Sequence, residues 1–120
     1  MKHFRSAVLF LALTVITAAQ TATIATLPTI TGDGAAHQLA TSGSARWVQF
    51  VATTGNAAAV RVGDSLTSAT RGIPVAAGGG WLFPPMPVDT RMSGQASLYK
   101  LSTIYYYAAS SDTLNVVIGQ

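Results

Sequence analysis

The chemistry that this sequence could carry depends on one histidine and a large supply of serine and threonine. His37 is the histidine outside the N-terminal segment, and it follows a Gly-rich turn. Nucleophilic catalysis by serine needs such a base within hydrogen-bonding reach, often beside a Gly-x-Ser-x-Gly elbow. The sequence has no elbow of this form. We therefore interpret His37 as a surface or turn residue.

The acidic residues of the chain are four separated aspartates: Asp33, Asp64, Asp89 and Asp112. Glycosidic hydrolysis needs two facing carboxylates, and a calcium loop needs several oxygen ligands close together. No Asp-x-Asp pattern is present, and each aspartate lies near residues typical of turns, so we interpret all four as turn formers. Cysteine is absent, which excludes disulfides and thiolate metal sites. The sequence predicts no catalytic residue, no cofactor and no metal site, so we expect a protein that is not an enzyme.

The stretch AAGGGWLFPP, residues 76–85, is the most unusual segment of the chain. A phosphate-binding loop would continue from its glycines to Lys and Ser or Thr, and this one continues to Trp81. Two interpretations stay open: a hairpin whose aromatic residues fill the core, and a surface that anchors a partner. The residues predicted for such an interface are Trp81, Leu82, Phe83, Pro84, Pro85, Met86, Tyr105 and Tyr107.

Three consecutive tyrosines, residues 105–107, raise the question of a sugar-stacking platform. Successive side chains of a strand point to opposite faces, so the three rings cannot form one platform. We therefore favour packing or subunit contact for Tyr105 and Tyr107, and carbohydrate binding is the weaker alternative.

Composition limits the partners further. The chain has 120 residues, of which 49% are hydrophobic and 9% charged, and its formal charge is +3. Two of the seven cationic residues lie at the extreme N-terminus, and the others are scattered among the four aspartates. Nucleic-acid binding requires a clustered basic face, so we expect none. A surface with so little charge is typical of a protein covered by neighbours.

Short strands separated by turns are the elements that must position these residues. Residues 45–53 have apolar side chains on both faces, which predicts a strand buried on both sides, and residues 113–119 alternate. We expect two hairpins, one joining residues 75–77 to 81–83 and one joining the strand that ends at the tyrosines to 113–119. The sequence predicts an all-β fold, a single small antiparallel β-sandwich or barrel-like domain over residues 26–120.

Residues 1–25 form an apolar N-terminal segment. Its basic start and its apolar run, residues 7–19, are typical of a secretory signal peptide, and an arm that is retained in the mature protein is the alternative. The run is shorter than the roughly 18 to 20 residues that a membrane-spanning helix needs. We therefore expect no spanning segment.

Three stretches carry a resemblance to a known class of proteins: ARWVQFVATTGNAAAVRVGD, TRGIPVAAGGGWLFPPM and LSTIYYYAASSDTLNVVIG. Together they resemble small virion structural proteins of tailed bacteriophages, over roughly residues 30–119. The resemblance implies a β-sandwich that decorates or cements a capsid, or that serves as a minor head or tail component. It implies other virion proteins as partners, assembly as an oligomer or assembly member, and no catalytic residues.

A second hypothesis comes from the N-terminal segment. If it is a cleaved signal peptide, the protein is an exported bacterial surface or periplasmic binding module, with carbohydrate as a candidate ligand.

Overall fold

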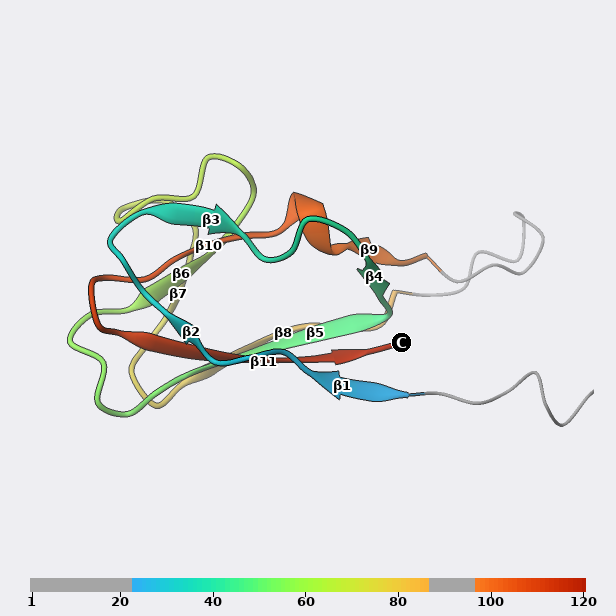
Figure 1. The fold of residues 1–120 in the computed structure, drawn as a ribbon, viewed down its shortest axis with the longest axis horizontal. Helices are drawn as coiled ribbons and strands as arrows, with labels where there is room; N and C mark the ends of the chain where they lie inside the picture. Colours follow the sequence, from blue (N-terminus) through green and yellow to red (C-terminus); the bar gives the residue numbers. More distant parts are fainter. Residues whose placement is uncertain (1–22, 87–96) are drawn as a thin grey trace, which may run out of the picture.

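The computed structural model describes residues 23–86 and 97–120. In this part of the chain, two antiparallel sheets pack face to face, and a two-stranded ribbon lies at one end (Figure 1). The predicted all-β sandwich is confirmed.

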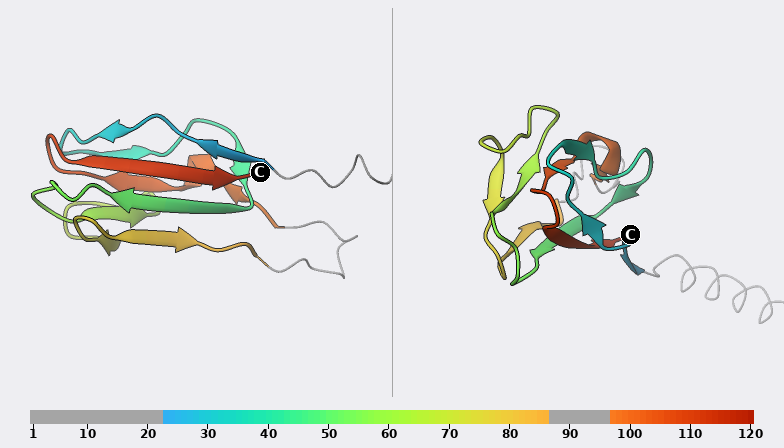
Figure 2. Two further views of the ribbon diagram at one scale, coloured as in Figure 1. Left: turned by 90° about the horizontal axis from the view of Figure 1, so that it is seen from below. Right: turned by 60° about the vertical axis from the view of Figure 1, so that its left-hand side comes forward.

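The first sheet, sheet A, has the strand order β1-β11-β5-β8, and β2 also pairs with β11. Figure 2 shows this order across the sheet, from β1 and β2 in blue to β8 in gold. Its strands are β1 (Ile24–Thr26), β2 (Ile30–Thr31), β5 (Trp47–Ala52), β8 (Gly80–Phe83) and β11 (Thr113–Gly119).

The second sheet, sheet B, has the order β3-β10-β6-β7, and the ribbon pairs β4 with β9. The strands of sheet B are β3 (Ala36–Gln38), β6 (Val60–Gly63), β7 (Ile73–Val75) and β10 (Tyr105–Tyr107). The ribbon consists of β4 (Ser44–Ala45) and β9 (Tyr99–Lys100), and a short 3-10 helix, η1 (Leu101–Thr103), leads from β9 to β10.

Alternating side chains of the two sheets build the core. Its largest fully buried residues are Val48, Phe50, Val60, Val62, Leu114 and Val116. The predicted alternation of residues 113–119 is confirmed, because Leu114, Val116 and Ile118 are all buried. The prediction that residues 45–53 are buried on both sides is wrong: Val51, on the face opposite Phe50, is 39% exposed. That face of β5 is the outer face of sheet A, and no described element covers it.

Both predicted hairpins are wrong. The strand at Ile73–Val75 belongs to sheet B and the strand at Gly80–Phe83 to sheet A, so the glycine-rich loop between them crosses the sandwich. The same holds for β10 and β11, whose connection at residues 108–112 also crosses from sheet B to sheet A. A Gly-rich or Ser-Asp turn reverses the chain in either case, and local sequence does not say to which sheet the chain returns.

Four of the described connections cross from one sheet to the other, and we call them arches. They are the β2–β3, β5–β6, β7–β8 and β10–β11 connections, and they gather at one end of the sandwich (Figure 1). The buried carboxylate of Asp112 joins two of them, accepting hydrogen bonds from the backbone N–H groups of Ala57 at 2.9 Å and Ala58 at 3.1 Å. The Asn56 side chain adds a reciprocal pair with the backbone of Thr113, at 2.9 and 2.8 Å. These bonds tie the β5–β6 arch to the β10–β11 arch, and we call this contact the Asp112 joint.

Gly32 lets a third arch, β2–β3, lie close against the Asp112 joint. A Cβ atom at this position would lie 2.3 Å from the carbonyl oxygen of Ala109, closer than any side chain tolerates. The Gly32 N–H donates to the Asp112 carbonyl at 2.7 Å, and its own carbonyl accepts from Ser111. The β2–β3 arch is therefore locked against the β10–β11 arch by backbone bonds.

The aspartates differ in what they stabilise. Asp33 and Asp64 form the predicted local turns, since each accepts a hydrogen bond from the backbone N–H two residues later. Asp112 instead reaches across to another arch, so its interpretation as a simple turn former is wrong. Asp89 lies outside the described residues.

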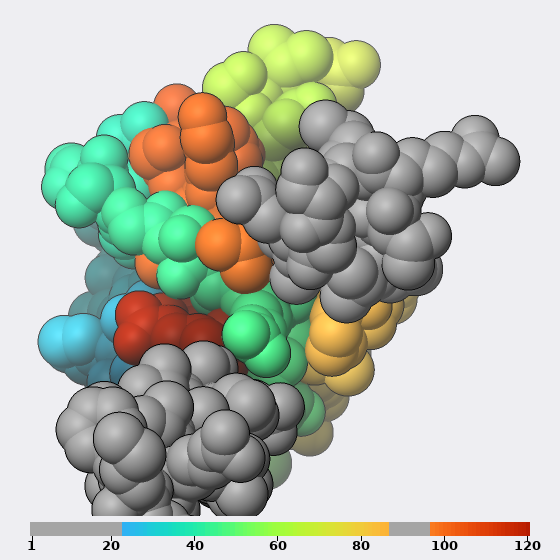
Figure 3. Space-filling view, turned by 90° about the vertical axis from the view of Figure 1, so that its right-hand side faces the viewer, coloured from blue at the N-terminus to red at the C-terminus, as the bar shows by residue number. Residues whose placement is uncertain are grey.

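The sandwich begins earlier than the expected boundary at residue 26. Ile24 and Ala25 pair with the end of β11, and Thr23 exchanges backbone hydrogen bonds with Gln120. Figure 3 views this end of the molecule, where the end of β11, in red, lies between β1 and the start of β5. The rest of the predicted N-terminal segment, residues 1–22, lies outside the described residues.

We predict that Asp112→Ala destabilises the fold by about 2–4 kcal/mol, because two backbone N–H groups lose a charged acceptor in a buried joint. The free energy of unfolding in urea measures this loss. Asp64→Ala is the matched control, since Asp64 is exposed and accepts one local bond. Equal losses in the two variants would contradict the importance assigned to the joint.

Candidate functional site

The predicted interface residues divide among three places in the structure. Leu82 and Pro85 lie on the outer face of sheet A, where they line a shallow depression of about 280 Å³ with Trp47 and Gln49. Trp81 and Phe83 point to the inner side, because they pair with the core residues Phe50 and Val48. Tyr105 and Tyr107 belong to sheet B. The structure therefore does not bring the two tyrosines together with the segment around Leu82.

The outer face of sheet A carries several large apolar side chains. Cross-strand register places Ile24, Trp47, Val51, Leu82 and Val117 on this face. Ile24 is 72% exposed and Leu82 45%. The other described strand residues of this face are Thr, Gln, Asn or Gly, and none is charged. Exposed faces of antiparallel sheets usually carry polar side chains, so this composition is unusual.

Trp47 lies at one end of this face, as the first residue of β5, and its side chain packs across β11. It lies directly opposite Gly119, and a Cβ atom on Gly119 would come within 2.0 Å of the Trp47 indole nitrogen. The indole therefore crosses the neighbouring strand where a side chain is missing. The second apolar face of residues 45–53 was predicted to be buried in the core. One signal in the sequence could have revealed this exposed face. Residues 45–53 and residues 113–119 both have a second face without charged side chains, which indicates that the two strands lie side by side with that face uncovered.

Aromatic packing fixes the exit from β8. The Phe83 ring lies 5.8 Å from the Phe50 ring at nearly a right angle and 5.7 Å from the Tyr99 ring. The Tyr99 hydroxyl donates to the carbonyl of Pro84 at 2.7 Å. Phe83 is thus a half-buried part of the sandwich, whereas Trp81, at the edge of sheet A, is 41% exposed. Pro84 is exposed, and Met86 is half-buried.

Tyr105 and Tyr107 lie on the outer face of sheet B. Their cross-strand partners in β6 are Gly63 and Arg61, whose guanidinium donates to the carbonyls of Ala69 and Gly72. Tyr106 points inward, opposite the buried Val62. The predicted alternation of the three rings is confirmed.

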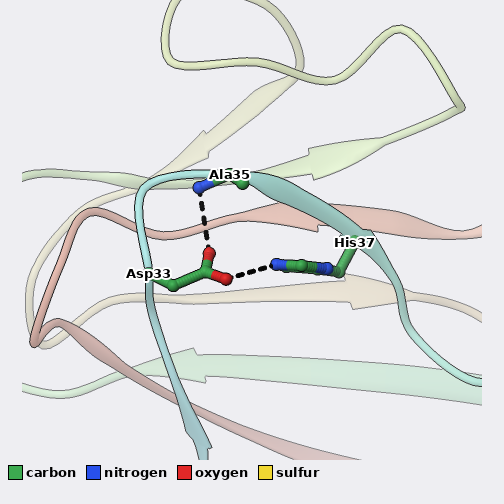
Figure 4. Close-up of polar contacts among 3 residues, drawn as sticks. All are labelled: Asp33, Ala35 and His37. Carbon is green, nitrogen blue, oxygen red and sulfur yellow. Dashed lines mark hydrogen bonds and ion pairs between the residues drawn. The ribbon is translucent and has the colours of Figure 1, made fainter.

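His37 forms a local pair with Asp33 (Figure 4). The Nε2 atom of His37 lies 2.7 Å from the Asp33 carboxylate, and because a carboxylate accepts, Nε2 carries the proton. The hydrogen bond from His37 and that from the Ala35 N–H lower the pKa of Asp33 from its ordinary value of 3.8. No hydroxyl among the described residues is hydrogen-bonded to the His37 ring, so the third member of a nucleophilic triad is not provided there.

Comparisons with protein-family models, with curated proteins and with solved structures found no match to this chain. The resemblance to bacteriophage virion proteins therefore stays a prediction.

Within residues 23–86 and 97–120, no three His, Cys, Asp or Glu side chains gather in a group that could hold a metal ion. No helix in the described part of the chain has the length and apolar character needed to cross a membrane.

We predict that His37→Ala raises the pKa of Asp33 toward 3.8, and that His37→Gln, which keeps a donor, raises it less. Carbon-13 NMR of the Asp33 carboxyl group over pH 2–6 measures both. A lowered folded pKa stabilises the protein above the unfolded value, and this small contribution is lost as pH falls through the folded pKa. An unchanged Asp33 titration in His37→Ala would contradict the pairing.

Proposed function

We propose that this protein is a non-enzymatic structural component of a bacteriophage virion, attached to other virion subunits through the outer face of sheet A. The observation that carries the proposal is that face itself, which exposes Ile24, Val51 and Leu82 together with the half-buried Trp47 and has no charged residue among its described strand positions.

Physical chemistry favours protein contact at this face. The centres of protein interfaces are depleted in charge and enriched in aromatic residues, and Trp is prominent among their energetic anchors. The Trp47 side chain already packs over Gly119, so it would lose little conformational freedom when a partner binds. Covering the apolar side chains around it would contribute about 25 cal/mol for each Å² removed from water.

The virion assignment rests on the sequence resemblance together with the low charge of the chain. A small sandwich with one uncharged face suits a decoration, cement or minor head or tail protein, whose partners are fixed neighbours. Assembly into such a particle would keep this face from water.

The alternative is an exported bacterial surface or periplasmic binding module. A cleft of about 480 Å³ at the side of the sandwich favours it, because that volume lies within the range of small-ligand pockets. The signal-like residues 1–25 point the same way.

We predict that Leu82→Asp weakens attachment to virions from the native source on the order of 100-fold, because the interface would bury an unpaired charge. Quantitative co-sedimentation with particles measures this. Leu66→Asp is the matched control: Leu66 is 58% exposed on the β6–β7 loop of sheet B, away from the proposed face. Both variants should keep the circular dichroism of the native protein. If both attach equally well, the outer face of sheet A is not the contact.

The two hypotheses predict different N-termini for protein isolated from its native source. A chain that keeps its N-terminal segment and co-purifies with phage particles is the expected result for a virion component. A chain shortened by about twenty residues and recovered from the periplasm or medium would establish the exported module instead. Intact-mass spectrometry distinguishes them.

A further inference from the structure

A cleft opens between the edges of the two sheets, on a different side from the outer face of sheet A. It has a volume of about 480 Å³. Figures 1 and 2 show β1 and β2 of sheet A on the same side of the sandwich as β3 of sheet B. The residues that line the cleft are Leu27, Pro28, Thr29, Ile30, Thr31, Leu39, Ala40 and Tyr106.

A break in the edge of sheet A leaves this side open. Pro28 separates β1 from β2 and has no N–H to donate to a neighbour. Leu27 bonds to Val116 of β11, while Leu39, just after β3, bonds to Ile104. The two edges are thus each tied to their own sheet. Side chains that are only half-buried, rather than a further strand, separate the core from water here.

Tyr106 is the aromatic member of a lining whose other side chains are aliphatic apart from Thr29 and Thr31. Its hydroxyl is hydrogen-bonded to none of the described residues, and no buried side-chain polar atom among them lacks a partner, so this hydroxyl is accessible. Burial of the ring raises the pKa of Tyr106 above its ordinary value of 10.0, which keeps the phenol protonated at neutral pH. The Thr29 hydroxyl is already used, because it donates to Asn115 at 2.9 Å.

Charge near the cleft disfavours an anion. The Asp33 carboxylate is close enough to raise the pKa of Tyr106 further, and the His37 ring lies 5.9 Å from the Tyr106 ring. Asp33 is itself hydrogen-bonded to His37 and Ala35. The lining has no cationic side chain to bind an anion and no carboxylate to bind a cation. Its free side-chain polar groups are the hydroxyls of Thr31 and Tyr106, too few to match the several hydroxyls of a sugar.

We propose that this cleft binds a small, neutral, largely apolar molecule that has one hydrogen-bond acceptor. The apolar part of the molecule contacts Leu27, Ile30 and Leu39, and its acceptor oxygen receives the O–H of Tyr106. The site is separate from the proposed virion contact, so either can fail without the other.

Two probes of similar size test the proposal: acetophenone, which has a carbonyl acceptor, and ethylbenzene, which has none. Titration of the full nitrogen-15-labelled chain by NMR should shift the amide signals of residues 27–31, 39 and 40 with both. Acetophenone should bind about fivefold more tightly, the effect of one net hydrogen bond. Tyr106→Phe should remove this difference while ethylbenzene binding stays. Tyr105→Phe, on the outer face of sheet B, is the matched control and should behave as the native protein.

Three results would overturn the proposal. One is the absence of shifts around the cleft at the solubility limit of both probes. Another is an acetophenone preference that survives Tyr106→Phe, which would place the acceptor elsewhere. The third is binding of methyl glucoside at the cleft without binding of acetophenone, which would establish a sugar site.

Discussion

The placement of one sheet on the other depends on the joint around Asp112. Four of the described connections cross between the sheets at this end, so no hairpin fixes the relative position of β11 and β10 or of β8 and β7. The Asp112 carboxylate binds the N–H groups of Ala57 and Ala58, and the backbone of Gly32 closes on the same arch. A buried carboxylate is stable only where donors replace its water, and here these donors belong to a different arch. The bonds that keep Asp112 in the interior are therefore the bonds that hold the arches together.

The arches that meet at this joint also determine where the two candidate sites lie, namely the cleft beside Tyr106 and the outer face of sheet A. The arch at Gly32 leads from β2 to β3, and so places the edges of both sheets on one side, with Tyr106 between them. The break at Pro28 keeps that side from closing. The arch after β7 brings Gly80–Phe83 to the edge of sheet A, which extends the uncharged outer face by one strand. One set of crossovers thus produces an open side with a small cleft and a broad apolar face.

Local patterns in the sequence were enough for the two longest strands, β5 and β11, and insufficient for the pairing of the strands. Alternation over residues 113–119 and the turns at Asp33 and Asp64 depend on neighbours in the chain, and the structure confirms them. Whether the loop at residues 76–79 makes a hairpin or an arch depends on which sheet receives the next strand, which is a long-range property. The hydrogen-bond partner of Asp112 is more than fifty residues away in the sequence. The position of the Trp47 side chain depends on the absence of a side chain at Gly119. Neither contact could be predicted from adjacent residues. The cleft was missed for the same reason, since its walls come from three separate segments.

The apolar second face of β5 is the feature of the sequence that supports the proposed function most directly. This strand has two apolar faces in its sequence, and the fold covers one of them. A face such as that of Trp47, Val51 and Leu82 favours association, because apolar surface left in water costs free energy that a neighbour can relieve. The neighbour is better placed on the face than at the edge: β8 has four residues, and Pro84 and Pro85 follow it at once. Proline has no N–H to donate, so an added strand would find a short ladder there. We therefore infer that side chains packed on the face of the sheet, rather than backbone pairing along its edge, would give such a contact its strength.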